Sequence, residues 1–133
     1  MQDFSKVKIA EVMTKSPRCI ELHQPIELAR SWMDELKVRH LPARESGRIV
    51  GILSDRDLQS VSASGSRVQA HEATVEDAMI SSILTVLDSQ TVSDVAKTMM
   101  SHRVGSVIVN GADGMLKGVF TDTDALKILS GQI

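Results

Sequence analysis

The chain has 133 residues, of which 42% are hydrophobic, so it is long enough to bury a core and too apolar to be disordered. Its 15 basic and 17 acidic side chains give a net charge of −2 and form no basic stripe, which argues against a nucleic-acid surface built on phosphate contacts. The aromatic residues are Phe4, Trp32 and Phe120 alone, too few for a base-stacking platform.

Cysteine usage and hydropathy bear on the compartment. Cys19 is the only cysteine, so no intrachain disulfide and no thiolate metal cage can form, and a reducing compartment suits the chain. Residues 1–13 carry four charged side chains and therefore contain no apolar signal segment. Apolar runs such as Ile49–Leu53 are too short to span a bilayer. We expect a cytoplasmic protein without membrane insertion.

The first half of the chain is predicted to contain three strands and three helices, because its apolar residues alternate or recur at helical spacing. Proline suits the first position of the longer helix, and Ser46-Gly47 suits a turn. In chain order, the expected elements are a short helix ending at Met13, a strand at Cys19–Leu22, a helix from Pro25, strands at His40–Arg44 and Ile49–Ser54, and a helix from Ser54.

The second half repeats this order after a linker at residues 62–72 that contains the sequence SASGS. Its expected elements are a short helix ending at Met79, a strand at Leu84–Leu87, an amphipathic helix through Val92–Met100, strands at Ser106–Asn110 and Met115–Thr121, and a helix from Thr121. We therefore expect a first unit at residues 7–61 and a second at residues 73–131.

The two halves also share short motifs at a nearly constant spacing, which indicates an internal duplication. The aligned pairs are EVM at 11–13 with DAM at 77–79, LARSWM at 28–33 with VAKTMM at 95–100, Gly51 with Gly118, and Asp57 with Asp124. The spacing is 66 residues for the first pair and 67 for the others. A single unit of about 60 residues is marginally stable, so we expect the two copies to pack on each other and form a cleft.

The motifs EVM, HLPA and GRIVGILSDRDL, with their second-copy equivalents, resemble the cystathionine-β-synthase-type (CBS) domain over about residues 7–131. Two such units in tandem are similar to a CBS pair, or Bateman module. The resemblance implies an α/β (α+β) fold of two β-α-β-β-α units packed about a pseudo-two-fold axis. It also implies a regulatory module whose cleft binds AMP, ADP, ATP or S-adenosylmethionine and requires no other cofactor.

Particular residues carry this resemblance to the ligand. The family element G-h-x-[ST]-x-x-D implies that the Ser or Thr and the Asp contact ribose and phosphate. Residues before the first strand of each copy are implied to meet the base, and basic residues at the second strand to meet phosphate. The resulting set is Ser54, Asp57, Thr121 and Asp124 for ribose, Ser16, Arg18, Ser82 and Ile83 for the base, and Arg39, His40 and Arg103 for phosphate.

A second interpretation of the ribose motif stays open at this point. The pattern [ST]-x-x-[DE] at a helix start is also a capping box, in which the hydroxyl accepts a backbone N–H and the acid reaches back. A carboxylate can also accept hydrogen bonds from a ribose diol beside the free N–H groups of a helix start. The copies differ in charge, because Gly105 and Ser106 replace Arg39 and His40 and Thr123 replaces Arg56. Unequal occupation of two sites is therefore expected.

The sequence favours a sensor over an enzyme. It contains no P-loop, no dinucleotide fingerprint and no nucleophile spaced with a base, and its histidines show no metal-ligand spacing. The apolar residues of the last helix predict a homodimer through the last helix of each unit, with a further protein that reads the signal. Two alternatives remain: a ligand-free dimerisation scaffold, or a regulatory fragment of a larger transporter or enzyme.

Overall fold

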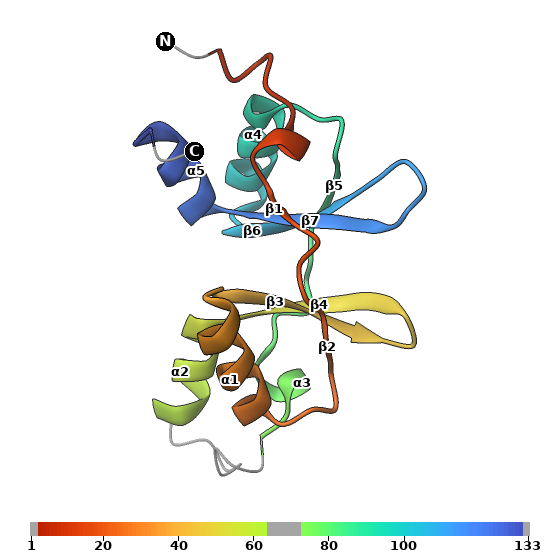
Figure 1. The fold of residues 1–133 in the computed structure, drawn as a ribbon, viewed down its shortest axis with the longest axis vertical. Helices are drawn as coiled ribbons and strands as arrows, with labels where there is room; N and C mark the ends of the chain where they lie inside the picture. Colours follow the sequence, from red (N-terminus) through yellow and green to blue (C-terminus); the bar gives the residue numbers. More distant parts are fainter. Residues whose placement is uncertain (1–2, 64–72, 132–133) are drawn as a thin grey trace. The chain divides into compact units, whose positions relative to one another are not determined.

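The computed structural model describes residues 3–63 and 73–131 and divides into two compact units (Figure 1). One is continuous in sequence, Arg18–Ile83, and is called the continuous unit below. The other combines Met1–Pro17 with Leu84–Ile133 and is called the split unit. Both contain a small sheet and helices, so the predicted mixed α and β class is confirmed.

The continuous unit folds around a three-stranded sheet. Its elements are β2 (Ile20–Glu21), α1 (Ile26–Leu36), β3 (His40–Glu45), β4 (Arg48–Ser54), α2 (Asp55–Ala63) and α3 (Val75–Ala78). The strand order is β2-β3-β4, with β2 parallel to β3 and an antiparallel β3–β4 hairpin. Ser46 and Gly47 have φ values of 51° and 79°, which confirms the turn predicted at this dipeptide.

The split unit has a four-stranded sheet. Its elements are the 3-10 helix η1 (Ile9–Glu11), β1 (Thr14–Lys15), β5 (Thr85–Leu87), α4 (Val92–His102), β6 (Ser106–Asn110), β7 (Leu116–Thr121) and α5 (Asp122–Leu129). The strand order is β1-β7-β6-β5, and only the β5–β6 pair is parallel. Strand β1 was not predicted, because two residues are too few to show an alternating pattern.

Each unit has its own core, formed by one face of its long helix against the sheet. In α1 the buried residues are Ile26, Ala29 and Met33, at the spacing of an amphipathic helix. The corresponding buried residues of α4 are Val92, Val95 and Met99. No helix among the described residues is long and apolar enough to cross a membrane.

The helix boundaries differ from the prediction at three places. Pro25 has an extended ψ of 148°, so it is the N-cap of α1 and not its first helical residue. The N–H of Ile26, which begins the helix, donates to the carbonyl of Ala73. The short helix expected to end at Met13 is a 3-10 turn that ends at Glu11. Helix α3 likewise ends one residue before Met79. Helix ends fray, and such one- or two-residue differences are normal.

One part of the predicted repeat alignment is wrong by one residue. The buried Met33 of α1 and Met99 of α4 are 66 positions apart, so Leu28–Met33 does not align with Val95–Met100 at a spacing of 67. The residues that end these helices, Lys37 and Arg103, both have left-handed φ and are also 66 positions apart.

The extra residue of the second copy lies in its hairpin turn. Between the paired residues Arg44 and Ile49 the first hairpin has four residues, 45–48. Between Asn110 and Leu116 the second has five, 111–115. An insertion in a surface turn leaves the core contacts unchanged, and it explains why equivalent residues are 66 positions apart before the turn and 67 after it.

The short segment before the first strand of each repeat packs in the unit that contains the other repeat's hairpin. A Cβ atom on Gly51 would lie 2.6 Å from the Met79 sulfur and 2.9 Å from the Ile80 carbonyl oxygen. A Cβ on Gly118 would lie 2.5 Å from the Met13 sulfur and 2.6 Å from the carbonyl oxygen of the next residue. Glycine at these positions therefore permits close backbone approach.

The predicted repeat boundaries, 7–61 and 73–131, are sequence units and do not coincide with the two compact units. They stay a proposal about the limits of the duplicated element. Of the predicted linker, residues 62–63 end α2, and residues 64–72 lie outside the described part of the chain.

Candidate functional site

The predicted ribose motif lies where β4 ends and α2 begins. Asp57 Oδ2 accepts the backbone N–H of Ser54 at 2.9 Å, and Ser54 Oγ accepts the N–H of Asp57 at 3.1 Å. This reciprocal pair is a capping box, so the local interpretation of the motif is confirmed. Within the described residues the other carboxylate oxygen, Oδ1, accepts no hydrogen bond and is available.

The same geometry is repeated where β7 ends and α5 begins. Asp124 Oδ2 accepts the Thr121 N–H at 3.0 Å and its hydroxyl at 3.1 Å, and Thr121 Oγ1 accepts the Asp124 N–H at 3.2 Å. Thr121 is buried, while Asp124 is half-buried. As at the first junction, Oδ1 of the aspartate has no hydrogen bond from a described residue. We call these two places the β4–α2 and β7–α5 junctions.

Arg39 and His40 lie beside the β4–α2 junction. The carbonyl oxygen of Arg39 accepts the Asp55 N–H at 2.9 Å, and His40 pairs with Ser54 across the hairpin. The side chains also approach, with Arg39 Nε 4.0 Å from Asp55 Oδ2; the Arg39 side chain is 73% exposed and that of Asp55 is 47% exposed. An exposed pair at this distance contributes little to stability, so the guanidinium can turn to an anion at small cost.

The second copy keeps this backbone arrangement but not the cation. Gly105 accepts the Asp122 N–H at 2.9 Å, and Ser106 pairs with Thr121. The predicted equivalence of Gly105-Ser106 with Arg39-His40 is therefore confirmed. Arg103 instead follows α4 in left-handed conformation, with φ of 56°, and its counterpart in the first copy is Lys37, not Arg39. A basic side chain at a helix C-terminus interacts favourably with the helix dipole, which is a structural reason for both residues.

Arg18 lies at the same end of the continuous unit's sheet as Arg39 and His40. Because Ile20 pairs in parallel with Ala43, Arg18 is level with Leu41. Its guanidinium carbon lies 4.2 Å from the centre of the Trp32 ring, on α1. The sequence did not reveal this cation–π contact, which holds a planar, charged group near the predicted ligand-binding residues.

Two of the other predicted base contacts lie away from the motif nearest to them. The Ser16 N–H donates to the Lys117 carbonyl, four residues along β7 from Thr121, which is about 13 Å in a strand. Ser82 is exposed and follows the antiparallel bridge between Ile52 and Ile80, so the same register places it level with Val50, four residues along β4 from Ser54. Ile83 directly precedes Leu84, whose carbonyl accepts the N–H of Ile108 in β6.

Cys19 is half-buried, directly before β2. Burial raises the pKa of its thiol above the ordinary value of 9.0, while the nearby Arg44 acts in the opposite direction. Such a thiol is a weak nucleophile at neutral pH. Among residues 3–63 and 73–131, no three His, Cys, Asp or Glu side chains gather closely enough to hold a metal ion.

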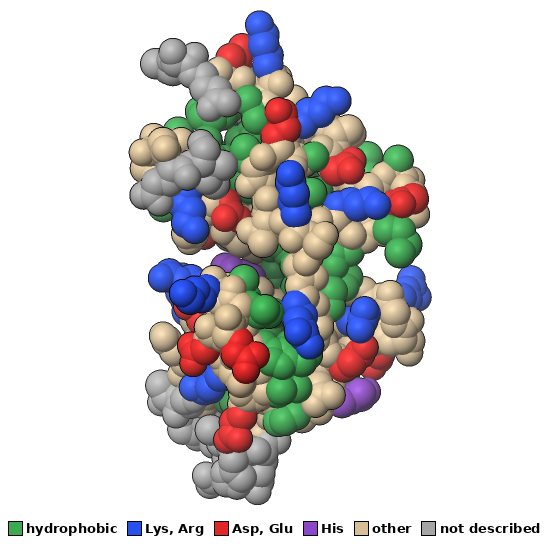
Figure 2. Space-filling view, in the orientation of Figure 1, with side chains coloured by type: hydrophobic (Ala, Val, Ile, Leu, Met, Phe, Trp, Pro, Cys, Tyr) green, Lys and Arg blue, Asp and Glu red, His purple; other side chains and the backbone are tan. Residues whose placement is uncertain are grey.

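The surface charges are mixed on the face drawn in Figure 2, where Lys and Arg side chains lie among Asp and Glu. No continuous basic stripe runs across this face. The two junctions differ from each other in local charge. The β4–α2 junction has Arg39, Arg56 and two aspartates, whereas the β7–α5 junction has Asp122 and Asp124 with Gly105 and Thr123 in place of the arginines.

The sequence is similar to known proteins along nearly its whole length. A family model described as "CBS domain" matches residues 9–64 and 75–131. A CBS domain-containing protein of Dictyostelium discoideum is 29% identical, covering 93% of this chain and 92% of its own length. An uncharacterized protein, MJ1232, of Methanocaldococcus jannaschii is 25% identical over 95% of this chain, which spans only 39% of that protein. An inosine-5'-monophosphate dehydrogenase of Thermoplasma acidophilum is 26% identical over 89% of this chain, which spans 22% of the enzyme.

Solved structures with the same fold share less sequence. The CBS domain of the bacterial CNNM/CorC family Mg2+ transporter has a TM-score of 0.81 at 22% identity, covering 98% of this chain and 79% of that one. The CBS domain pair of MJ0100, in complex with 5-methylthioadenosine and S-adenosyl-L-methionine, has a TM-score of 0.77 at 20% identity, covering 96% and 98%. CBSX2 in complex with AMP has a TM-score of 0.75 at 22% identity, covering 94% and 97%.

Proposed function

Since the chain belongs to the CBS domain family and contains two CBS domains, we propose that it is a regulatory module that binds an adenosine-containing ligand. The candidate ligands are AMP, ADP, ATP and S-adenosylmethionine. Two proteins of the same fold support this proposal, because one was crystallised with AMP and the other with S-adenosyl-L-methionine. Binding shifts the conformation or the oligomeric state of the module, and a further protein reads that change.

The observation that carries the proposal is the unused carboxylate oxygen at each junction. The capping box occupies Oδ2 of Asp57 and of Asp124, and Oδ1 of each is left to accept a hydrogen bond. A ribose diol offers two O–H donors, and a carboxylate is the acceptor that binds them most strongly. Capping and ribose binding are therefore compatible functions of one aspartate, although the sequence presented them as competing interpretations.

The charges favour different ligands at the two junctions. A phosphate placed near Asp57 would meet that carboxylate, and Arg39, His40, Arg56 and Arg18 are the groups that can offset the repulsion. At the β7–α5 junction, Asp122 and Asp124 stand without an arginine at the position of Arg39. We assign phosphate-bearing nucleotides to the junction with Arg39 and ligands without phosphate, or with positive charge, to the other.

A thermal-shift series tests this proposal. Ligand at 100 times its dissociation constant adds about 2.7 kcal/mol to the free energy of unfolding, which at roughly 2–8 °C per kcal/mol raises the melting temperature by about 5–20 °C. Arg39→Ala should reduce the shift caused by AMP and leave the shift caused by adenosine unchanged. The matched control is Arg48→Ala, an exposed arginine at the start of β4, which should alter neither shift.

A homodimer through α5 is part of the proposal. Leu126 and Leu129 are 65% and 71% exposed on that helix, which is typical of a contact surface when large apolar side chains lie together. The first copy contributes less than expected, because Leu58 of α2 is buried in its own core. Within α5, Ile128 is also buried and does not contribute to an exposed surface. The dimer surface is thus assigned mainly to α5. A cytoplasmic location likewise stays a prediction.

A second candidate function has a specific observation in its favour. The chain spans 39% and 22% of two of the relatives it matches, and the fold also occurs in a transporter's CBS domain. A regulatory part of a larger enzyme or transporter would bind the same ligands, so this candidate concerns the partner and not the site. A ligand-free scaffold is the remaining candidate, and the absence of any thermal shift with all four ligands would favour it.

A further inference from the structure

Residues 84–131 of the split unit pack against a single short segment of the chain, residues 3–15. The surface that this segment covers is called the groove below. Ile9 of this segment is completely buried in the core of the unit. Four half-buried apolar residues of the segment pack against the same core: Phe4, Val7, Val12 and Met13. In Figure 1 the red segment runs beside α4 and β7. Without it, this core would be open to water on one side.

The segment also satisfies the first N–H groups of α4. The Val92 N–H donates to the Val7 carbonyl at 2.8 Å, and the Ser93 N–H donates to the Phe4 carbonyl at 3.1 Å. In return, the Ile9 N–H donates to the Gln90 carbonyl at 2.8 Å. The N–H groups of a helix start have no partner within the helix, so residues 84–131 require such a segment for polar as well as apolar reasons.

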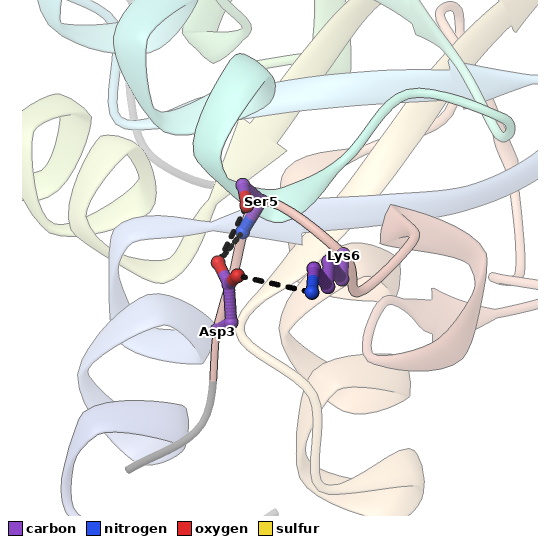
Figure 3. A network of polar contacts seen from close by, with 3 residues as sticks. All are labelled: Asp3, Ser5 and Lys6. Atoms are coloured by element: carbon purple, nitrogen blue, oxygen red, sulfur yellow. Dashed lines mark hydrogen bonds and ion pairs between the residues drawn. The ribbon is translucent and has the colours of Figure 1, made fainter.

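The start of the segment is held in a turn (Figure 3). Asp3 Oδ1 accepts both the N–H of Ser5 at 3.0 Å and its hydroxyl at 2.5 Å, and Lys6 Nζ lies 4.0 Å from Asp3 Oδ2. These hydrogen bonds from Ser5 lower the pKa of the Asp3 carboxyl. The turn directs the Phe4 carbonyl to α4. The start of the segment therefore has internal contacts of its own, besides those that it makes with α4.

The link between this segment and the continuous unit is strained. The chain passes from one unit to the other at Pro17–Arg18, and the preceding Ser16 has φ of 47°. Left-handed backbone is costly for a residue other than glycine, and a residue before proline strongly prefers extended backbone. The corresponding residue of the second crossing, Ser82, has no positive φ. Strain is thus confined to the crossing that carries the segment.

We propose that residues 3–15 exchange between two copies of the chain, so that the segment of one copy fills the groove on residues 84–131 of the other. Every contact that residues 3–15 make with residues 84–131 is the same in the exchanged and closed forms, and the link at Ser16–Pro17 changes conformation. Short links under strain favour such exchange, and an extended Ser16 in the exchanged form removes the left-handed conformation. This surface is separate from the apolar face of α5 and does not depend on a ligand.

Two single-cysteine chains test the proposal, each in a Cys19→Ser background. Lys8 and Thr91 form an isolated antiparallel bridge, and the Cα atoms of such a pair lie within the range that a disulfide spans. A Lys8→Cys chain is mixed with a Thr91→Cys chain at high concentration, equilibrated and then oxidised. Exchange predicts a mixed disulfide dimer on a non-reducing gel, which a dimer through α5 alone cannot give.

The controls make a negative result informative. A chain with both cysteines must close its intrachain disulfide, which shows that the pair is correctly placed. Lys8→Cys mixed with Arg48→Cys, an exposed residue at the start of β4, measures random collision. Ser16→Gly relaxes the closed link and should lower the yield of mixed disulfide by about tenfold or more. The proposal is overturned if the mixed disulfide does not exceed the collision control while the intrachain disulfide forms, or if Ser16→Gly leaves its yield unchanged.

Discussion

Asp57 and Asp124 each use carboxylate oxygen Oδ2 to accept a backbone N–H, while Oδ1 accepts no hydrogen bond from a described residue. Changing either residue to alanine removes a helix cap, so the free energy of unfolding should fall by about 0.5–2 kcal/mol. If Oδ1 binds a ribose diol, ligand affinity should also fall at least about tenfold, as expected for a hydrogen bond to a charged group. Calorimetric titration and urea unfolding measure the two effects separately.

A matched control exists in α3. Thr74 and Asp77 form a third capping box, in which Asp77 Oδ2 accepts the Thr74 N–H at 2.9 Å. Asp77→Ala should lower stability by a similar amount and leave ligand affinity unchanged. Unchanged affinity in both the Asp57 and Asp124 variants would contradict the ribose assignment and leave those residues as caps only.

Cys19 gives a pH-dependent prediction. Burial raises the pKa of its thiol in the folded protein above its unfolded value, so the folded state holds the proton to higher pH. The thiol therefore lowers stability as pH rises through the unfolded pKa near 9.0, and it has no such effect below that pH. Cys19→Ala should flatten the alkaline part of the stability profile measured by urea unfolding. A profile unchanged by this substitution would show that ionisation of Cys19 has no part in it.

At the scale of elements, the two motif glycines are structural. Gly51→Ala and Gly118→Ala would place a methyl group within 3 Å of a backbone carbonyl oxygen as well as a methionine sulfur. Overpacking of this kind costs about 1–3 kcal/mol, because a backbone atom cannot move aside as a side chain can. Gly105→Ala is the control, since its nearest neighbour at 3.1 Å is the side-chain oxygen of Asp122. Equal stability of all three variants would contradict the close approach described for Gly51 and Gly118.

Local pattern predicted most of these elements. The β3–β4 and β6–β7 hairpins, both long helices and both capped junctions were expected, because alternation, amphipathic spacing and capping residues are short-range signals. Strand β1 and the packing of Met13 on Gly118 were not, since they join residues more than 100 positions apart and leave no periodic trace. The same limit applies to the site. Arg39 and Gly105 were aligned correctly from the motif, whereas the stacking of Arg18 on Trp32 and the position of Ser16 beside Lys117 depend on tertiary contacts.

At the scale of the whole molecule, we expect a dimer through α5. Light scattering behind a sizing column should give about twice the chain mass of 14.5 kDa. Leu126→Asp with Leu129→Asp should convert it to monomer, because both side chains are exposed in the single chain. Met100→Asp, at an equally exposed apolar position on α4, should leave the dimer intact. A wild-type monomer at micromolar concentration, or dissociation by the α4 change alone, would contradict the assignment to α5.

The binding of an adenosine ligand is the central claim, and isothermal titration calorimetry tests it most directly. The purified chain, stripped of bound nucleotide by unfolding and refolding, is titrated with AMP, ADP, ATP, S-adenosylmethionine and adenosine. We expect saturable heat with at least one phosphate-bearing nucleotide. The affinity for that nucleotide should fall in the Arg39→Ala chain, while the affinity for adenosine should not. Absence of binding heat and of any melting-temperature shift with all five compounds at millimolar concentration would contradict that claim.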